Sequence, residues 1–226
     1  MDSILALDDS LTLFFNGSDF EYLDHAIMLA TATWTWIPAG LVLLFVCYRN
    51  LPLQQFILLF LALALTIACS DLLCDDIVKP YFARPRPSRD PDLSPFIDIV
   101  DNYRGGRYGF FSAHASNTMA VAMLYIRVIR DRIVGLLMLL WVLLNCYTRL
   151  YLGVHYFGDV TVGLCFGAMW GLLFAWLYFK VSKLQRGHAS KARTSTGFRR
   201  TDTRMVAWVM AASIVAVFLA PLVYSY

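Results

Sequence analysis

The sequence predicts an all-α fold, a polytopic bundle of six transmembrane helices. The first observation behind this is composition: of the 226 residues, 59% are hydrophobic and only 15% are charged, whereas soluble domains carry about 25% charged residues. The second is the mean hydropathy of +0.59. The third is that apolar runs of about 20 residues, long enough to cross a bilayer, recur along the chain. The length suits one membrane domain over 1–226.

Six apolar runs can be read along the chain. They cover 26–48, 53–73, 113–129, 133–149, 157–179 and 205–224. The third run is the least apolar, because His114, Ser116 and Asn117 occupy its first turn. Polar groups are costly in lipid, so we expect these three side chains to face protein or water and to serve function.

The fifth run contains a repeat of small residues. Gly163, Gly167 and Gly171 recur every four residues, a spacing that lets two helices approach closely. We expect this face to pack inside the bundle, with dimerisation as the alternative.

The distribution of Lys and Arg predicts how the bundle is oriented. With the N-terminus outside, the cytoplasmic connections hold twelve of these residues and the outside segments hold seven, in line with the positive-inside rule. Eight of the twelve, Arg186 among them, lie in a cytoplasmic basic loop, 180–204. We therefore expect a bacterial inner (cytoplasmic) membrane protein with both termini extracytoplasmic. The net charge of +3 does not indicate a nucleic-acid partner.

Two connections complete the layout, and we expect the residues before the first run to form an extracytoplasmic N-terminal tail. The Ser, Thr and Gly content of 180–204 suggests flexibility, and its cations suit anionic lipid headgroups. A long extracytoplasmic loop, 88–108, joins the second and third helices, and a loop of this length is typically functional. Its apolar residues alternate with aspartates, which favours a short amphipathic element at the membrane interface; they are Phe96, Ile97, Ile99 and Val100.

Three polar clusters interrupt the apolar chain, at 79–87, 110–115 and 148–159. The predicted orientation places all three on the extracytoplasmic side of the membrane. Together they supply three cations, of which arginine suits two-pronged contact with phosphate oxygens. They also supply polar residues around the backbone amides of a helix N-terminus, where anions bind. The cations are Lys79, Arg86 and Arg149, and the polar residues are Ser112 and His114.

The third cluster also contains a histidine and a carboxylate four residues apart. On a helix, His155 and Asp159 would stack on one face, and the carboxylate would hold the imidazole in one tautomer. One such cluster alone is more typical of an interfacial anchor or a helix cap. Two histidines, one carboxylate and three cations together favour phosphoryl transfer through a histidine nucleophile.

At these residues the chain resembles the type 2 phosphatidic acid phosphatase (PAP2) superfamily. Three sequence motifs characterise that family: K-x6-R-P, P-S-G-H and S-R-x5-H-x3-D. They are matched in turn by Lys79 with Arg86-Pro87, by Ser112 with His114, and by Arg149 with His155 and Asp159. Three positions depart from the pattern without removing a titrating group: Phe111 replaces proline, Ala113 replaces glycine and Thr148 replaces serine.

The resemblance implies a role for each matching residue. His155 would attack phosphorus and form a phosphohistidine, with Asp159 orienting it. His114 would protonate the leaving oxygen and then activate water. The phosphate would be bound by Lys79, Arg86, Ser112, Arg149 and the amide of Ala113. No cofactor and no metal would be required, because protein cations take the place of magnesium.

The expected function is hydrolysis of a lipid phosphate or lipid pyrophosphate drawn from the bilayer. The candidates are undecaprenyl pyrophosphate, lipid A, phosphatidylglycerophosphate and phosphatidic acid, and the sequence leaves the choice open. It also leaves open the oligomeric state. Two alternatives remain: a sugar-phosphate phosphatase or phosphotransferase on the same fold, and a non-catalytic lipid transporter or scaffold. Intact His114, His155 and Asp159 disfavour the second.

Overall fold

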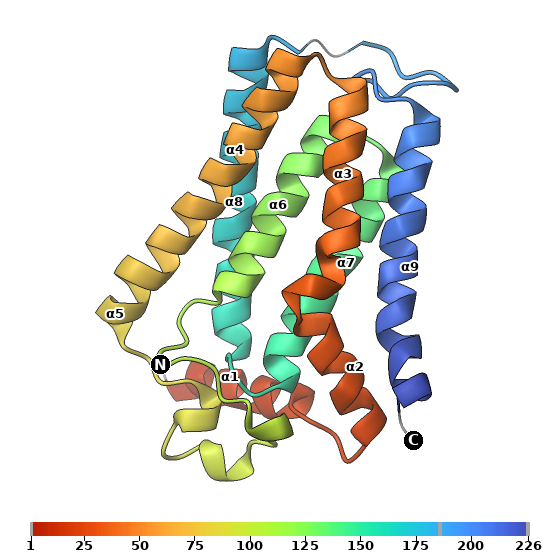
Figure 1. Ribbon diagram of the computed structural model, residues 1–226. Coiled ribbons are helices and arrows are strands. Elements are labelled where there is room, and N and C mark those ends of the chain that lie inside the picture. The colour runs from red at the N-terminus through yellow and green to blue at the C-terminus, as the bar shows by residue number, and fades with distance from the viewer. Residues whose placement is uncertain (1, 185–186, 225–226) are drawn as a thin grey trace.

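The computed structural model describes residues 2–184 and 187–224 (Figure 1). Over this part of the chain the regular secondary structure is helical, and β-pairing is limited to two isolated bridges. The bundle consists of α3 (Ile37–Asn50), α4 (Leu53–Asp71), α6 (Ala113–Ile129), α7 (Arg132–Tyr151), α8 (Phe157–Ser182) and α9 (Arg200–Tyr224). In Figure 1, α6 lies among the other helices, and it packs against α4, α7 and α8. Arg186, one of the basic-loop cations, lies outside the described residues.

Four helical segments of the described chain are long and apolar enough to cross a membrane. They are Leu53–Phe82, Arg132–Tyr151, Phe157–Ser182 and Arg200–Val223. A fifth candidate is the bent pair Glu21–Thr31 and Thr33–Asn50. The helix α6 coincides with the expected run 113–129 but has only 17 residues. The all-α membrane architecture is therefore confirmed, whereas the count of six spans stays a prediction.

The small residues of α8 face α6. A β-carbon built on Gly163 would lie 2.6 Å from the carbonyl oxygen of Ser112, and one on Gly171 would lie 2.4 Å from that of Ala120. Real β-carbons do not approach an oxygen so closely, so only glycine permits this helix separation. The expectation that the repeat packs within the bundle is confirmed.

Most of the described N-terminal segment is helical and does not form the tail expected from the sequence. In Figure 1, α1 (Asp2–Phe15) lies across one end of the bundle, and α2 (Glu21–Thr31) follows it. The expected first span, 26–48, is broken at Ala32, whose extended backbone separates two helical segments bent by 68°. The indole of Trp36 donates to the carbonyl of Ala30 (2.9 Å), satisfying an acceptor that the break exposes.

The expectation of flexibility in 180–204 is wrong for its second half. Phe198 is fully buried, and Thr196 donates to the carbonyl of Ile129 (3.1 Å). The backbone amide of Thr194 donates to the carbonyl of Phe198 (2.9 Å), which closes a tight turn. Buried threonines with satisfied hydroxyl groups hold this loop against the end of α6.

The long connection between the second and third predicted spans is mostly irregular. After α5 (Lys79–Phe82) it contains three short 3-10 turns, at Pro87–Arg89, Ser94–Phe96 and Val100–Asn102. Ile97 and Val100 are buried, and Ile97 packs on Tyr156. Phe96 is exposed. The apolar residues of this loop therefore turn mainly toward the protein, and the expected amphipathic interfacial element is limited to Phe96.

Candidate active site

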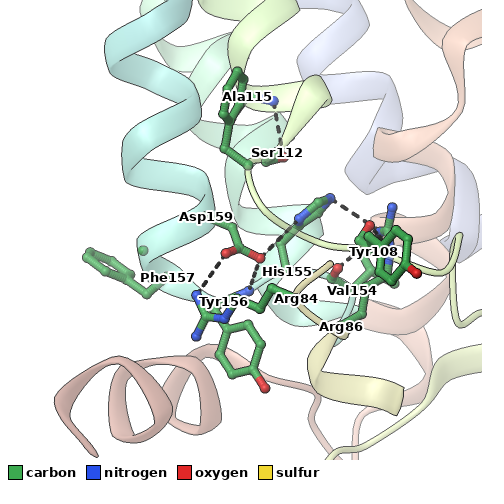
Figure 2. A network of polar contacts seen from close by, with 12 residues as sticks. Arg84, Arg86, Tyr108, Ser112, Ala115, Val154, His155, Tyr156, Phe157 and Asp159 are labelled. Carbon is green, nitrogen blue, oxygen red and sulfur yellow. Dashed lines mark hydrogen bonds and ion pairs between the residues drawn. The ribbon is translucent and has the colours of Figure 1, made fainter. Parts of the chain in front are cut away.

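The three polar clusters meet at the end of the bundle that α1 covers (Figures 1 and 2). The first follows α4, whose last turns widen into a π-helix, Leu72–Val78, before α5. The second forms the N-terminus of α6, and the third is the turn between α7 and α8. The π-helix is rare and concentrates at functional sites. The structure thus brings residues from sequence positions 79 to 159 to one place.

His155 lies at the centre of the cluster and is almost fully buried. Its Nδ1 atom is 3.5 Å from Oδ2 of Asp159, and its Nε2 atom is 3.3 Å from Nη1 of Arg86 (Figure 2). The two ring nitrogens therefore face opposite charges. With a proton on Nδ1, beside the carboxylate, the lone pair of Nε2 points toward the guanidinium.

The pairing of His155 with Asp159 has a different cause from the one expected. Helix α8 begins at Phe157, so His155 lies before the helix and does not stack on its face. Instead, Asp159 folds back over the helix start, and the amide of Tyr156 donates to Oδ2 of Asp159 (3.2 Å). A carboxylate in the first turn satisfies helix amides that have no internal partner. This capping contact brings the carboxylate to His155.

Arg86 is held by backbone carbonyl groups. Its Nε donates to the carbonyl of Tyr108 and its Nη1 to that of Val154, each at 3.1 Å. Gly105 has φ of +62°, and a β-carbon there would lie 2.7 Å from Nη1 of Arg86. The 105–109 segment therefore wraps the guanidinium closely, which fixes the direction in which its remaining N–H groups point.

Arg149 is a buried cation with a free donor. It is 1% exposed, and its Nε donates to the hydroxyl of Thr148 (3.1 Å). Its Nη2 atom meets no hydrogen-bond partner within the described part of the chain. An unsatisfied buried donor on a charged group is costly, and an anionic ligand would remove that cost.

The remaining expected residues surround this core. Lys79 is mostly buried and pairs with Asp75 of the π-helix. His114, in the first turn of α6, is partly exposed; the loss of solvent around its ring and the positive charges of Arg149, Arg86 and Lys79 lower its pKa. Ser112 is the N-cap of α6: its hydroxyl accepts from the amide of Ala115 (3.4 Å).

The backbone amides of Ser112 and Ala113 have different roles. The amide of Ser112 donates to the carbonyl of Asp159 (3.0 Å), which ties α6 to the start of α8. Ala113 is the first residue of α6, and amides in a first helical turn have no intrahelical acceptor. This is the amide assigned to phosphate from the sequence.

Electrostatics favour a neutral His155. Burial lowers the pKa of His155 well below its ordinary value, and the charges of Arg86, Arg149 and Lys79 lower it further. A neutral imidazole has a lone pair available for attack on an electrophile. The surrounding cations oppose protonation of the ring and attract a phosphate to the same place.

Sequence reasoning missed Arg84. Its Nη1 lies 2.9 Å from Oδ1 of Asp159, and its Nη2 lies 2.8 Å from Oδ2 of Asp8 in α1. Its guanidinium carbon stands 3.6 Å from the centre of the Tyr156 ring. Arg84 lies between Lys79 and Arg86 in the first cluster, but no sequence pattern indicates that it pairs with a carboxylate 75 positions later.

Comparison with known proteins places this architecture in a class. The family model of the PAP2 superfamily matches residues 55–183. The chain therefore belongs to the PAP2 superfamily, and it is an integral membrane phosphatase, a phosphate monoester hydrolase.

Two relatives match nearly the whole length of the chain. The lipid A 4'-phosphatase of Bacteroides thetaiotaomicron is 32% identical over 197 residues, covering 87% of this chain and 88% of the relative. The lipid A 4'-phosphatase of Porphyromonas gingivalis is 30% identical over 211 residues, covering 93% and 89%. The crystal structure of Aquifex aeolicus LpxE matches the fold with a TM-score of 0.54 and 22% identity, over 73% of this chain and 92% of that chain.

Proposed function

We propose that the protein hydrolyses a phosphate monoester on a lipid A-type glycolipid, through a phosphohistidine on His155. The observation that carries the reaction type is the arrangement of the His155 ring: Nδ1 faces Asp159 and Nε2 faces Arg86. A phosphate bound to the guanidinium would place its phosphorus beside the nucleophilic nitrogen. The two lipid A 4'-phosphatases that resemble the whole chain support the substrate class.

In the proposed first step Nε2 of His155 forms a bond to phosphorus, and the bond between phosphorus and the lipid oxygen breaks. The negative charge of the bound phosphate would offset the nearby cations and favour protonated His114, which gives its proton to that oxygen, so that the lipid leaves as an alcohol. Arg86, Arg149 and Lys79 balance the charge on the transferring group, as cations do in other phosphoryl transfers. Asp159 stabilises the imidazole as it gains positive character.

In the second step a water molecule attacks the phosphohistidine. His114, now without its proton, accepts one from the water, and the bond from phosphorus to Nε2 breaks. Inorganic phosphate leaves, and both histidines return to their starting states. The three protein cations supply the charge that magnesium supplies elsewhere, which supports a reaction independent of added metal.

We place the reaction on the outer side of the bacterial inner membrane. The support is the charge asymmetry of the connections, because the site lies at the opposite end of the bundle from the basic loop. A lipid substrate would reach the site from the leaflet on that side.

A phosphate-release assay with purified protein in detergent, with EDTA present, tests the proposal. The panel contains lipid A, undecaprenyl pyrophosphate, phosphatidylglycerophosphate, phosphatidic acid and a soluble hexose phosphate. We expect the highest kcat/KM on lipid A, with mass spectrometry showing loss of one phosphate. Preference for the hexose phosphate would favour the sugar-phosphate alternative, and no release from any compound would favour a transporter or scaffold. Loss of activity in EDTA that magnesium restores would contradict metal independence.

A further inference from the structure

We propose that Arg84, anchored by Asp8 of α1, is a positioning residue that holds the Asp159 carboxylate toward His155. This inference rests on the proposed roles of His155 and Asp159. It extends the active site to the N-terminal helix, which contains none of the family's motif residues. Three layers of contact lead from α1 to the histidine.

The first layer fixes the carboxylate. Asp159 is fully buried, and both its oxygens are used: Oδ2 faces Nδ1 of His155 and the amide of Tyr156, while Oδ1 accepts from Arg84 (2.9 Å). A β-carbon on Gly109 would lie 2.8 Å from the same Oδ2. With Arg84 on one oxygen, rotation of the carboxylate away from His155 would break a charged hydrogen bond in a buried place.

The second layer fixes Arg84. Its other nitrogen, Nη2, donates to Asp8 (2.8 Å), and its flat guanidinium lies over the ring of Tyr156. The hydroxyl of Tyr156 donates in turn to Asp90 (3.0 Å). A guanidinium held at both terminal nitrogens and along one face has little freedom to move. Lysine, which has a single ammonium group, could not make this set of contacts.

The third layer attaches α1 to the start of α8. The amide of Gly158 donates to Oδ1 of Asp8 (2.6 Å), and the amide of Phe157 donates to the hydroxyl of Thr12 (3.0 Å). Asp8 and Thr12 are four residues apart, so they lie on one face of α1. Asp8 therefore caps α8 from another helix and also holds Arg84. Movement of α1 would disturb both supports of Asp159.

Arg84 also favours the ionised form of Asp159. Burial disfavours a charged carboxylate, and the adjacent guanidinium, 2.9 Å away, opposes that effect. Without this positive charge, Asp159 should take up a proton at a higher pH, and a neutral Asp159 would no longer hold His155 with its proton on Nδ1. A merely structural residue would have no such effect on the acidic side of the pH profile, so the profile separates the two roles.

The test compares Arg84→Gln, Arg84→Lys, Asp8→Asn and the double variant Asp8→Asn/Arg84→Gln in the phosphate-release assay. We expect Arg84→Gln to lower kcat by about 10²-fold, the size of effect that a small misplacement of catalytic groups produces, with KM changed only a few-fold. The acidic limb of kcat/KM should move to higher pH. Arg84→Lys should keep the acidic limb of kcat/KM at its wild-type pH and should lose less activity than Arg84→Gln. Asp8→Asn should lower kcat by about 10-fold, and the double variant should be less impaired than the product of the single effects.

Asp131→Asn is a matched control at the other end of the bundle. Asp131 also caps a helix, accepting from the amides of Ile133 (3.0 Å) and Val134 (3.3 Å) at the start of α7, and it also pairs with an arginine, Arg200 (3.1 Å). We expect this variant to melt at a lower temperature while its kcat and pH profile stay those of the wild type.

Four outcomes would overturn the inference. They are an Arg84→Gln kcat within twofold of wild type, a rise in KM at constant kcat, an unchanged acidic limb, or an equal loss of kcat in Asp131→Asn. If Arg84→Gln does not fold, Arg84→Lys and Asp8→Asn decide by the same criteria. Absence of phosphate release by the wild-type protein would instead contradict the proposed function.

Discussion

Gly167 of α8 lies against Ser116 of α6 so closely that a β-carbon on Gly167 would sit 2.2 Å from the Ser116 carbonyl oxygen. The contact is one turn along α6 from the Ser112 N-cap, and the Ser116 hydroxyl is itself hydrogen bonded to Ser70 of α4 (2.7 Å). Three helices are thus brought together directly behind the candidate site.

The first prediction concerns this contact. Gly167→Ala should push α8 away from α6 and lower stability by roughly 1–3 kcal/mol, the usual cost of overpacking. Thermal unfolding in detergent, followed by tryptophan fluorescence, measures the change. Gly40→Ala is the control, because a β-carbon on Gly40 meets nothing within 4 Å. Equal melting temperatures for Gly167→Ala and wild type would show that the helices separate without cost.

A second prediction addresses the nucleophile. His155→Asn should reduce phosphate release by about 10⁴-fold or more, as loss of a catalytic triad member does elsewhere. The amide side chain is polar and smaller, so the protein should still fold and elute from a sizing column as the wild type does. Turnover within a few-fold of wild type would remove His155 from the mechanism.

Titration of the same residue gives a third prediction. The folded protein keeps His155 neutral, because its pKa lies well below the ordinary value, whereas the unfolded chain binds a proton below about pH 6.5. The unfolded state then binds more protons, so stability should fall as the pH falls through that value. Melting temperatures measured between about pH 5 and pH 8 should therefore decline more steeply toward acid in the wild type than in His155→Asn. Parallel curves would mean that His155 titrates normally.

A fourth prediction concerns orientation. In a background without native cysteines, Phe96→Cys should react with an impermeant thiol reagent added to intact cells. Ala192→Cys, in the basic loop, should react only after the membrane is opened. Moving each loop cation outward against the membrane potential would cost about 2.3 kcal/mol per 100 mV. A reversed pattern would place the site in the cytoplasm.

The sequence predicts α6 well because its ends are determined locally. Ser112 caps the first turn, and Arg130 ends the helix in the left-handed conformation with φ of +54°. The motif residues also converge as their spacing indicates. His155 and Asp159 do so for a reason that helical periodicity does not describe, since the contact depends on an aspartate capping the amide of Tyr156.

The N-terminal helix and Arg84 could not be found in this way. Residues 2–15 form too short a helix to span a membrane, and their acidic residues resemble those of a solvated tail. The structural role of Asp8 consists of its contacts with Arg84, 76 positions later, and with Gly158, 150 positions later. A single sequence contains no periodicity over such distances, so these pairs appear only in three dimensions.

The separation between Asp8 and Gly158 also determines the order in which the molecule can be completed. The ribosome completes α1 long before α8, so α1 has no partner on α8 while the helices between them are being made. Its closure onto α8 forms a loop of 150 residues, and contacts of such separation form slowly because closing a long loop costs chain entropy. A newly made chain therefore passes through a stage in which most of the bundle is present and the carboxylate beside the nucleophile is not yet secured.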